Sequence, residues 1–244
     1  MAIPIPSDGS LAPRRPTWGI PDALIGYVVV YIAAVIIGAA IFATAGYSDD
    51  PLDSPLIVQF VANLPLWLGI LGLAIGVSAY KGNGWIADYH VALKAWDVPI
   101  GIGAGLLAQL VLVPLIAWPV LELSGKSADD LAKVAEDLGD KVHNPADAIV
   151  FIVVVGLIAP ICEEVFFRGL LFRSFEKRLG AWWALGLSSV LFAATHGQLL
   201  QFVPLIAAGA VFGYLVVRTG RLGPAIVAHT AFNLTTVVSL LWLT

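Results

Sequence analysis

Long runs of apolar residues, separated by short polar segments, make up most of this chain. A helix crosses the hydrocarbon core of a bilayer with roughly 20 apolar residues, and most of these runs are that long. The pattern therefore predicts an all-α polytopic membrane protein with about seven transmembrane helices. The predicted spans are residues 21–46, 56–80, 99–123, 149–178, 181–198, 202–217 and 222–243, of which the fifth looks short.

The composition agrees with this fold class. Apolar residues make up 59% of the 244 residues and charged residues 12%, whereas a soluble domain has about a quarter charged residues. The net charge of -4 is spread among the loops, which argues against a nucleic-acid partner. The single cysteine, Cys162, excludes an internal disulfide and a cysteine-based zinc site. Cys162 is adjacent to Glu163, but a small buried cysteine is a commoner case than a thiol nucleophile.

The polar segments divide the chain into four regions. Residues 1–20 predict a disordered cytoplasmic tail and residues 21–123 a three-helix membrane region. Residues 124–147 are polar and acidic, carry a capping-box pattern at Ser127 and Asp130, and repeat apolar residues at helical spacing. They predict an amphipathic loop helix on the outer surface; a plain solvated connection and a lid over the site stay open. Residues 148–244 carry the candidate chemistry.

Lysine and arginine alternate in number from loop to loop, which predicts the orientation. Nine of these residues fall on one side of the predicted spans and three on the other, where they lie among acids. Because cytoplasmic loops are enriched in Lys and Arg, we place the N-terminus inside. The expected location is the plasma membrane of a prokaryote.

Three ionisable residues interrupt the fourth apolar run: Glu163, Glu164 and Arg168. A charged side chain in the bilayer centre costs roughly 2.5 to 3.5 kcal/mol on insertion scales, so such residues usually face inward and are paired. Glu164 and Arg168 are i,i+4 neighbours on one helix face, whereas Glu163 lies about 100° away. The spacing predicts one carboxylate held by arginine and one free carboxylate. The alternative is a purely structural salt bridge with Glu163 in a polar cavity.

Two later apolar runs carry His196, and His229 with Asn233 at i+4. A depth count at 1.5 Å per residue separates His196 from Glu163 and His229 by roughly 15 Å. Tilt, a shorter fifth helix or a kink near Pro160 would reduce that distance. We expect Glu163, His196 and His229 to converge, because their shared chemistry offers a reason for polar groups in lipid.

These side chains suit peptide hydrolysis. A carboxylate and a histidine can deprotonate a water, and a second histidine and an asparagine amide can donate hydrogen bonds to the oxyanion that forms. Alternatively, Glu163, His196 and His229 would be three ligands of a divalent metal such as zinc, with water in the fourth position. The chain lacks the H-E-x-x-H pattern, so the sequence leaves the metal open.

Three short motifs follow one another in order: E-E-x-x-x-R at Glu163–Glu164–Arg168, F-x-x-x-H at Phe192–His196, and H-x-x-x-N at His229–Asn233. Together they resemble the CAAX prenyl endopeptidase and bacteriocin-processing family, also called CPBP or Abi intramembrane proteases. The resemblance implies an all-helical membrane protease in which Glu163, His196 and His229 are catalytic and Asn233 assists. Glu164, Arg168 and Phe192 would then support the site.

We therefore expect an intramembrane endopeptidase that acts on membrane-associated or lipidated peptide or protein substrates. Two other hypotheses stay open: a non-catalytic membrane partner or immunity factor with the same fold, and a proton-coupled transporter that uses Glu and His as a relay. A transporter predicts inverted repeats in both halves of the chain, whereas the ionisable groups here crowd into one half.

Overall fold

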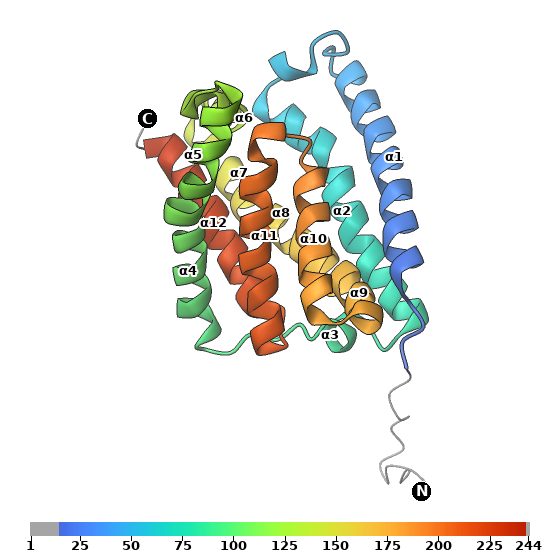
Figure 1. Cartoon of the computed structure of the whole chain (residues 1–244). Coiled ribbons are helices and arrows are strands. Elements are labelled where there is room, and N and C mark those ends of the chain that lie inside the picture. Colours follow the sequence, from blue (N-terminus) through green and yellow to red (C-terminus); the bar gives the residue numbers. More distant parts are fainter. Residues whose placement is uncertain (1–14, 243–244) are drawn as a thin grey trace, which may run out of the picture.

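The computed structural model describes residues 15–242, and within this range it contains helices and no strand (Figure 1). Among the described residues, six helical segments are long and apolar enough to cross a membrane. They are α1 (Ile20–Thr44), α2 (Leu56–Lys81), α4–α5 (Asp97–Ser124), α7–α9 (Pro145–Leu179), α11 (Leu199–Thr219) and α12 (Gly223–Trp242). The length and apolar composition of these helices identify an integral membrane protein.

The outer faces of the helices are apolar, as lipid-facing surfaces are. On α1, for example, Ile25 is 66% exposed and Ile36 is 65% exposed. Close packing of helices uses small residues: a Cβ atom at Gly105 of α4 would overlap the carbonyl oxygen of Ala228 on α12. Gly105 therefore lets these two helices approach at backbone distance.

The seventh apolar helix, α10 (Ala181–Thr195), is shorter than the others. Its 15 residues span about 22 Å, less than the roughly 30 Å of a bilayer core. The exposed indoles of Trp182 and Trp183 at its start fit an interfacial aromatic belt. If α10 starts at the inner interface, its other end lies inside the membrane. The sequence prediction of about seven spans thus corresponds to six long helices and one short one.

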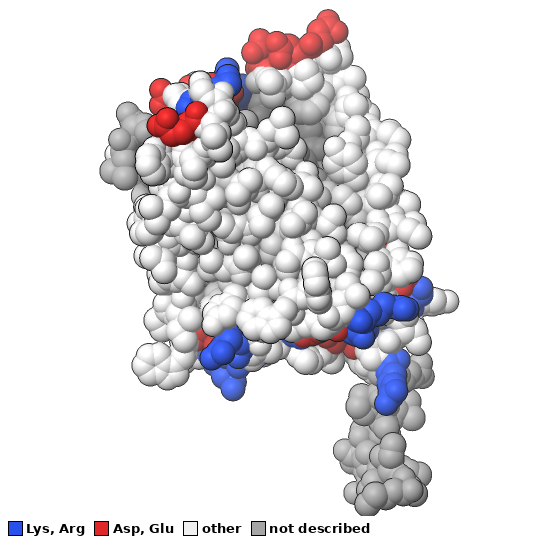
Figure 2. Space-filling model, viewed as in Figure 1, with Lys and Arg blue, Asp and Glu red and all other residues white. Residues whose placement is uncertain are grey.

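Charged side chains gather at the two ends of the bundle. Figure 2 shows the Lys and Arg side chains mainly at the lower end, where α1 begins and the short helix α3 (Trp85–Asp88) lies, and a largely acidic upper end. We call these the basic end and the acidic end. The predicted cytoplasmic tail, residues 1–20, falls mostly outside the described residues. Its last part, residues 15–19, is extended and packs on the basic end.

A cluster around Asp88 closes the basic end. Its carboxylate accepts hydrogen bonds from Nε1 of Trp18 at 3.0 Å and from the Ser78 hydroxyl at 2.5 Å. The Lys177 ammonium lies 2.9 Å from the centre of the Trp18 ring. Burial alone would raise the pKa of Asp88, but hydrogen bonds from the hydroxyl, the indole and a neighbouring amide outweigh it and hold the pKa below its usual 3.8. The first helix is thereby tied to α3 and α9.

The segment α7–α9 is not a uniform α-helix. It runs as α7 (Pro145–Val153), the π-helix η3 (Val154–Ile158), α8 (Ala159–Glu164), the π-helix η4 (Val165–Leu171) and α9 (Phe172–Leu179). A π-helix bonds i to i+5 and occurs often at functional sites. Another π-helix, η2 (Ala108–Leu112), joins α4 (Asp97–Leu107) to α5 (Val113–Ser124). The two glutamates therefore lie on a short α-helical piece between two π-helices.

The acidic segment predicted at residues 124–147 contains the helix α6 (Ala128–Gly139). The Ser127 hydroxyl accepts from the Asp130 amide, and the Asp130 carboxylate accepts from the Ser127 amide, so the expected capping box is present. Nε2 of Gln201 on α11 donates to the Leu131 carbonyl at 2.8 Å. The helix α6 is thus attached to the acidic end. The loop after α1 contains a 3-10 turn, η1 (Pro51–Asp53).

Candidate active site

A buried ion pair forms the base of the site. Nη1 of Arg168 donates to Oε1 of Glu164 at 2.8 Å, and both side chains are 0% exposed. Nη2 of Arg168 donates to the Gly209 carbonyl on α11 at 2.9 Å, and the guanidinium lies 4.6 Å from the centre of the Phe192 ring. The i,i+4 spacing in the sequence predicts this pair, and the structure contains it.

The same glutamate holds a histidine from α12. Nδ1 of His229 lies 2.9 Å from Oε1 of Glu164. A carboxylate only accepts hydrogen bonds, so Nδ1 carries the proton and Nε2 of the neutral ring keeps a lone pair. The ring stacks on Phe212 at 4.7 Å and meets Phe192 edge-on at 5.5 Å, and His229 is 3% exposed. The ion pair and the two aromatic rings fix both the tautomer and the orientation of His229.

Glu163 faces the other nitrogen of this histidine. Its Oε2 lies 3.8 Å from Nε2 of His229, and its side chain is 16% exposed. At this distance the two groups are close but not in direct hydrogen-bond contact. Glu164 is buried on one side of the imidazole and the more accessible Glu163 is on the other, so the two adjacent glutamates occupy different environments.

His196 caps the end of α10. Its Nδ1 lies 2.8 Å from the Phe192 carbonyl oxygen, and its ring meets the Phe192 ring at 4.8 Å. His196 and His229 therefore contact the same phenylalanine ring, and they are closer than the depth count of roughly 15 Å predicts. The count was wrong because a uniform rise of 1.5 Å per residue ignores helix tilt; Figure 1 shows α7–α9 and α12 running obliquely behind α10 and α11.

Asn233 lies one turn beyond His229 on α12. Its Nδ2 donates to the Val155 carbonyl of η3 at 2.8 Å. A π-helix disturbs the regular i to i+4 pairing, and this amide satisfies one of the carbonyls involved. The second N–H of the amide remains available for another acceptor.

The candidate residues do not gather as metal ligands usually do. Within residues 15–242, no group of three His, Cys, Asp or Glu side chains lies close enough to hold a metal ion. The set suggested by the sequence, Glu163, His196 and His229, thus does not form a ready three-ligand site within the described residues.

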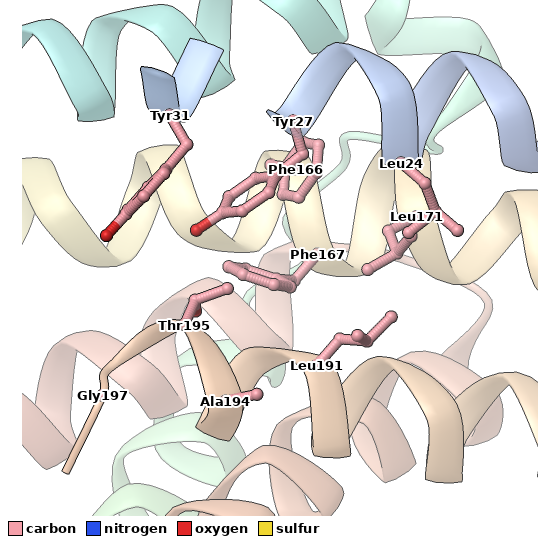
Figure 3. A pocket seen from close by; sticks show the side chains of 10 residues that line it. All are labelled: Leu24, Tyr27, Tyr31, Phe166, Phe167, Leu171, Leu191, Ala194, Thr195 and Gly197. Carbon is pink, nitrogen blue, oxygen red and sulfur yellow. The ribbon is translucent and has the colours of Figure 1, made fainter. Parts of the chain in front are cut away.

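Sequence reasoning missed Tyr27, a residue of α1. Its ring packs on Phe166 at 5.4 Å and on Phe167 at 6.5 Å, and it lines a cavity together with Thr195. Figure 3 shows the hydroxyl of Tyr27 at the Thr195 end of a cavity between α1 and α10. A tyrosine within an apolar run gives no sequence signal for this role. Phe212 was missed for the same reason.

Comparisons with known proteins agree with this geometry. Residues 145–235 match the model of the family described as "Rce1-like: Type II CAAX prenyl endopeptidase Rce1-like". This segment is similar to the Rce1-like CAAX prenyl endopeptidase family. The Rce1-like segment contains all three motifs, from Glu163 to Asn233, whereas Tyr27 and the helix α1 lie outside it.

A curated relative matches the chain over 82 residues with 33% identity. It is the "Putative membrane peptidase YdiL" of Bacillus subtilis (strain 168). The match covers 34% of this chain and 34% of the relative, so the chain spans about a third of the length of that protein. No solved structure matches the chain significantly.

Proposed function

We propose that this chain is an intramembrane endopeptidase that hydrolyses peptide bonds in membrane-associated or lipidated substrates. The observation that carries the proposal is the contact of Glu163 with a histidine, His229, whose other nitrogen is held by the buried Glu164–Arg168 pair. A base oriented by a fixed carboxylate is the arrangement that general-base hydrolysis needs. The family match supports the same reaction class.

A water shared by Glu163 and His229 is the proposed nucleophile. Two hydrogen bonds of about 2.8 Å each can span the 3.8 Å between Oε2 of Glu163 and Nε2 of His229. Both atoms are acceptors when Nδ1 of His229 carries the ring proton, and two facing acceptors need a donor between them. Water supplies two such protons. As its oxygen attacks the substrate carbonyl, Glu163 takes one proton as general base.

The oxyanion that forms on the carbonyl needs hydrogen-bond donors. The second N–H of Asn233 is one donor. His196 donates its Nδ1 proton to the Phe192 carbonyl, so its Nε2 becomes a donor when the ring is protonated. In a serine protease, removing one such donor costs about 2.7 to 4 kcal/mol of transition-state stabilisation. When the C–N bond breaks, Glu163 returns its proton to the leaving amine.

The test is a peptide-library cleavage assay on the purified, detergent-solubilised protein. We expect Glu163→Gln to abolish cleavage, because a neutral amide cannot accept the water proton. The matched control is Glu122→Gln, an exposed residue at the end of α5, which should cleave like the wild type. Cleavage that survives in Glu163→Gln, or a wild type that cleaves no peptide, would contradict the proposal. Running the assay with and without a chelator shows whether a metal contributes.

A further inference from the structure

A cavity of about 300 Å³ lies between α1 and α10, beside the proposed active site (Figure 3). Its walls are mainly apolar and come from α1, η4 and α10, with Leu24, Phe166, Phe167 and Leu191 among them. Three hydroxyl-bearing residues also line it: Tyr27, Tyr31 and Thr195. An apolar pocket with a few polar groups is typical of sites that bind organic ligands.

The cavity reaches the catalytic groups. Phe166 and Phe167, which line the cavity, follow Glu163 by three and four residues on the same helical segment. Thr195 directly precedes His196 in the chain. A side chain held in this cavity would therefore lie next to the carboxylate that we propose as the base.

Shared residues connect this cavity to the acidic end. Tyr31 also lines a crevice of about 480 Å³ between α1 and α2. Asn63 of α2 lines this crevice and a more polar pocket of about 630 Å³ at the acidic end, which includes Asp53 and Asp137. Figure 2 shows the surface hollowed near the acidic end, between α1 and the rest of the bundle. The three spaces thus follow one another, through shared lining residues, from the acidic end to the cavity between α1 and α10.

The direction of the route has a structural cause. The helix α10 spans only about 22 Å and ends at Thr195, so α10 does not continue beside α1 above this point. Toward the basic end, the side chains next to Arg168 fill the space: Leu170, Leu171, Phe172 and Phe175 are all buried. Below them, Trp18 and Tyr89 are also buried, and the Tyr89 hydroxyl donates to the Ala74 carbonyl at 2.7 Å.

We propose that the substrate reaches Glu163 along α1 from the acidic end, and that the cavity between α1 and α10 binds an apolar side chain of this substrate beside the scissile bond. The inference rests on the function proposed above. With the acidic end outside, the expected substrate is an apolar peptide segment inserted in the outer half of the membrane. A peptide tail that enters from the cytoplasm would not use this route.

Thiol labelling tests the route independently of activity. In a Cys162→Ala background, which removes the native thiol, Tyr31→Cys is treated with a membrane-impermeant methanethiosulfonate in intact cells and in inverted vesicles. Lys133→Cys marks the acidic end and Arg178→Cys the basic end. We expect Tyr31→Cys to react from the same side as Lys133→Cys. Reaction from the side of Arg178→Cys, or from neither side, overturns the route.

Blocking variants test the cavity with a peptide that the wild type cleaves. Ala194→Trp fills the mouth of the cavity on α10, and Asn63→Trp narrows the far end of the route; both positions are exposed, so folding should survive. We expect each to lower kcat/KM at least tenfold. The control is Val29→Trp, on the lipid-facing side of α1 at 60% exposure, which should stay within twofold of wild type. Unchanged cleavage in the two blocking variants overturns the inference, while loss of cleavage in Glu163→Gln leaves the proposed function standing.

Discussion

Removing Glu164 should harm both stability and catalysis, because one oxygen of this residue serves two partners. Oε1 accepts from Arg168 at 2.8 Å and from His229 at 2.9 Å, and Oε2 is buried without a hydrogen-bond partner among the described residues. Glu164→Ala removes both contacts and leaves the Arg168 guanidinium, 0% exposed, without its counter-ion.

The size of the stability loss follows from burial. Removing one partner of a buried ion pair typically costs about 3 to 5 kcal/mol, because the remaining charge stays desolvated and unpaired. The Gly209 carbonyl and the Phe192 ring still contact Arg168, so we expect the lower half of that range. Glu164→Gln keeps an acceptor oxygen for both partners, but hydrogen bonds to a charged group are roughly twice as strong as neutral ones. The loss of stability in Glu164→Gln should therefore lie between zero and that of Glu164→Ala.

A double variant separates stability from catalysis. Glu164→Leu with Arg168→Met replaces the buried pair by apolar side chains, a change that is often neutral or stabilising. We expect it to recover most of the stability but not the cleavage, because nothing then holds the Nδ1 proton of His229. Loss of such a carboxylate partner lowers kcat by about 10⁴-fold in a serine protease. The measurements are unfolding in mixed micelles and kcat/KM for each variant.

Two results would refute this reasoning. If Glu164→Ala unfolds at the same denaturant concentration as the wild type, the charge of Arg168 does not depend on Glu164. If the double variant regains near wild-type turnover, Glu164 does not orient His229, and the assignment of roles to the two glutamates is wrong.

Three further predictions follow from other parts of the molecule. Gly209→Val should lower cleavage at least tenfold, because a Cβ there would lie 3.1 Å from Nη2 of Arg168; Gly186→Ala, where a Cβ meets nothing within 4 Å, is the control. The pKa of Asp88 lies below its usual 3.8, so its stabilising contribution is present at neutral pH and is lost as pH falls below about 4. Asp88→Asn should therefore make the unfolding midpoint depend less on pH between pH 7 and 3. An unchanged pH dependence would contradict the role of Asp88 in the cluster at the basic end. A reporter fused after Lys133 should lie outside the cell, and a cytoplasmic signal there would reverse the proposed orientation.

The sequence predicts the fold class well because its signal is local. Apolar runs of 20 or more residues leave few alternatives, and the i,i+4 spacing of Glu164 and Arg168 predicts their contact. The boundaries of α10 were less certain, since the apolar pattern continues to Gln198 whereas the helix ends at Thr195. Helix ends in apolar sequence depend on packing, which no periodicity records.

The arrangement of the site was harder to predict, because it depends on contacts between distant segments. Glu164 and His229 are 65 residues apart, and helical spacing does not indicate that Nδ1 of the histidine meets this glutamate instead of Glu163. Tyr27 is a still clearer case. The helix α1 is apolar on all sides, so its sequence does not show which face packs on the bundle or which side chain approaches the site.

The π-helices on both sides of Glu163 and Glu164 affect how the family segment can tolerate insertions and deletions. A π turn accommodates one residue more than an α turn, so deleting one residue within η4 (Val165–Leu171) can restore an α-helix without breaking the chain. In a regular α-helix, by contrast, deleting one residue would rotate everything beyond it by about 100° relative to the glutamates. A π-helix that loses its extra residue keeps the residues beyond it on their original faces, so the motif residues can still meet. Homologues that differ in length between the two glutamates and α10 should therefore be compared by helix register and not by motif spacing alone.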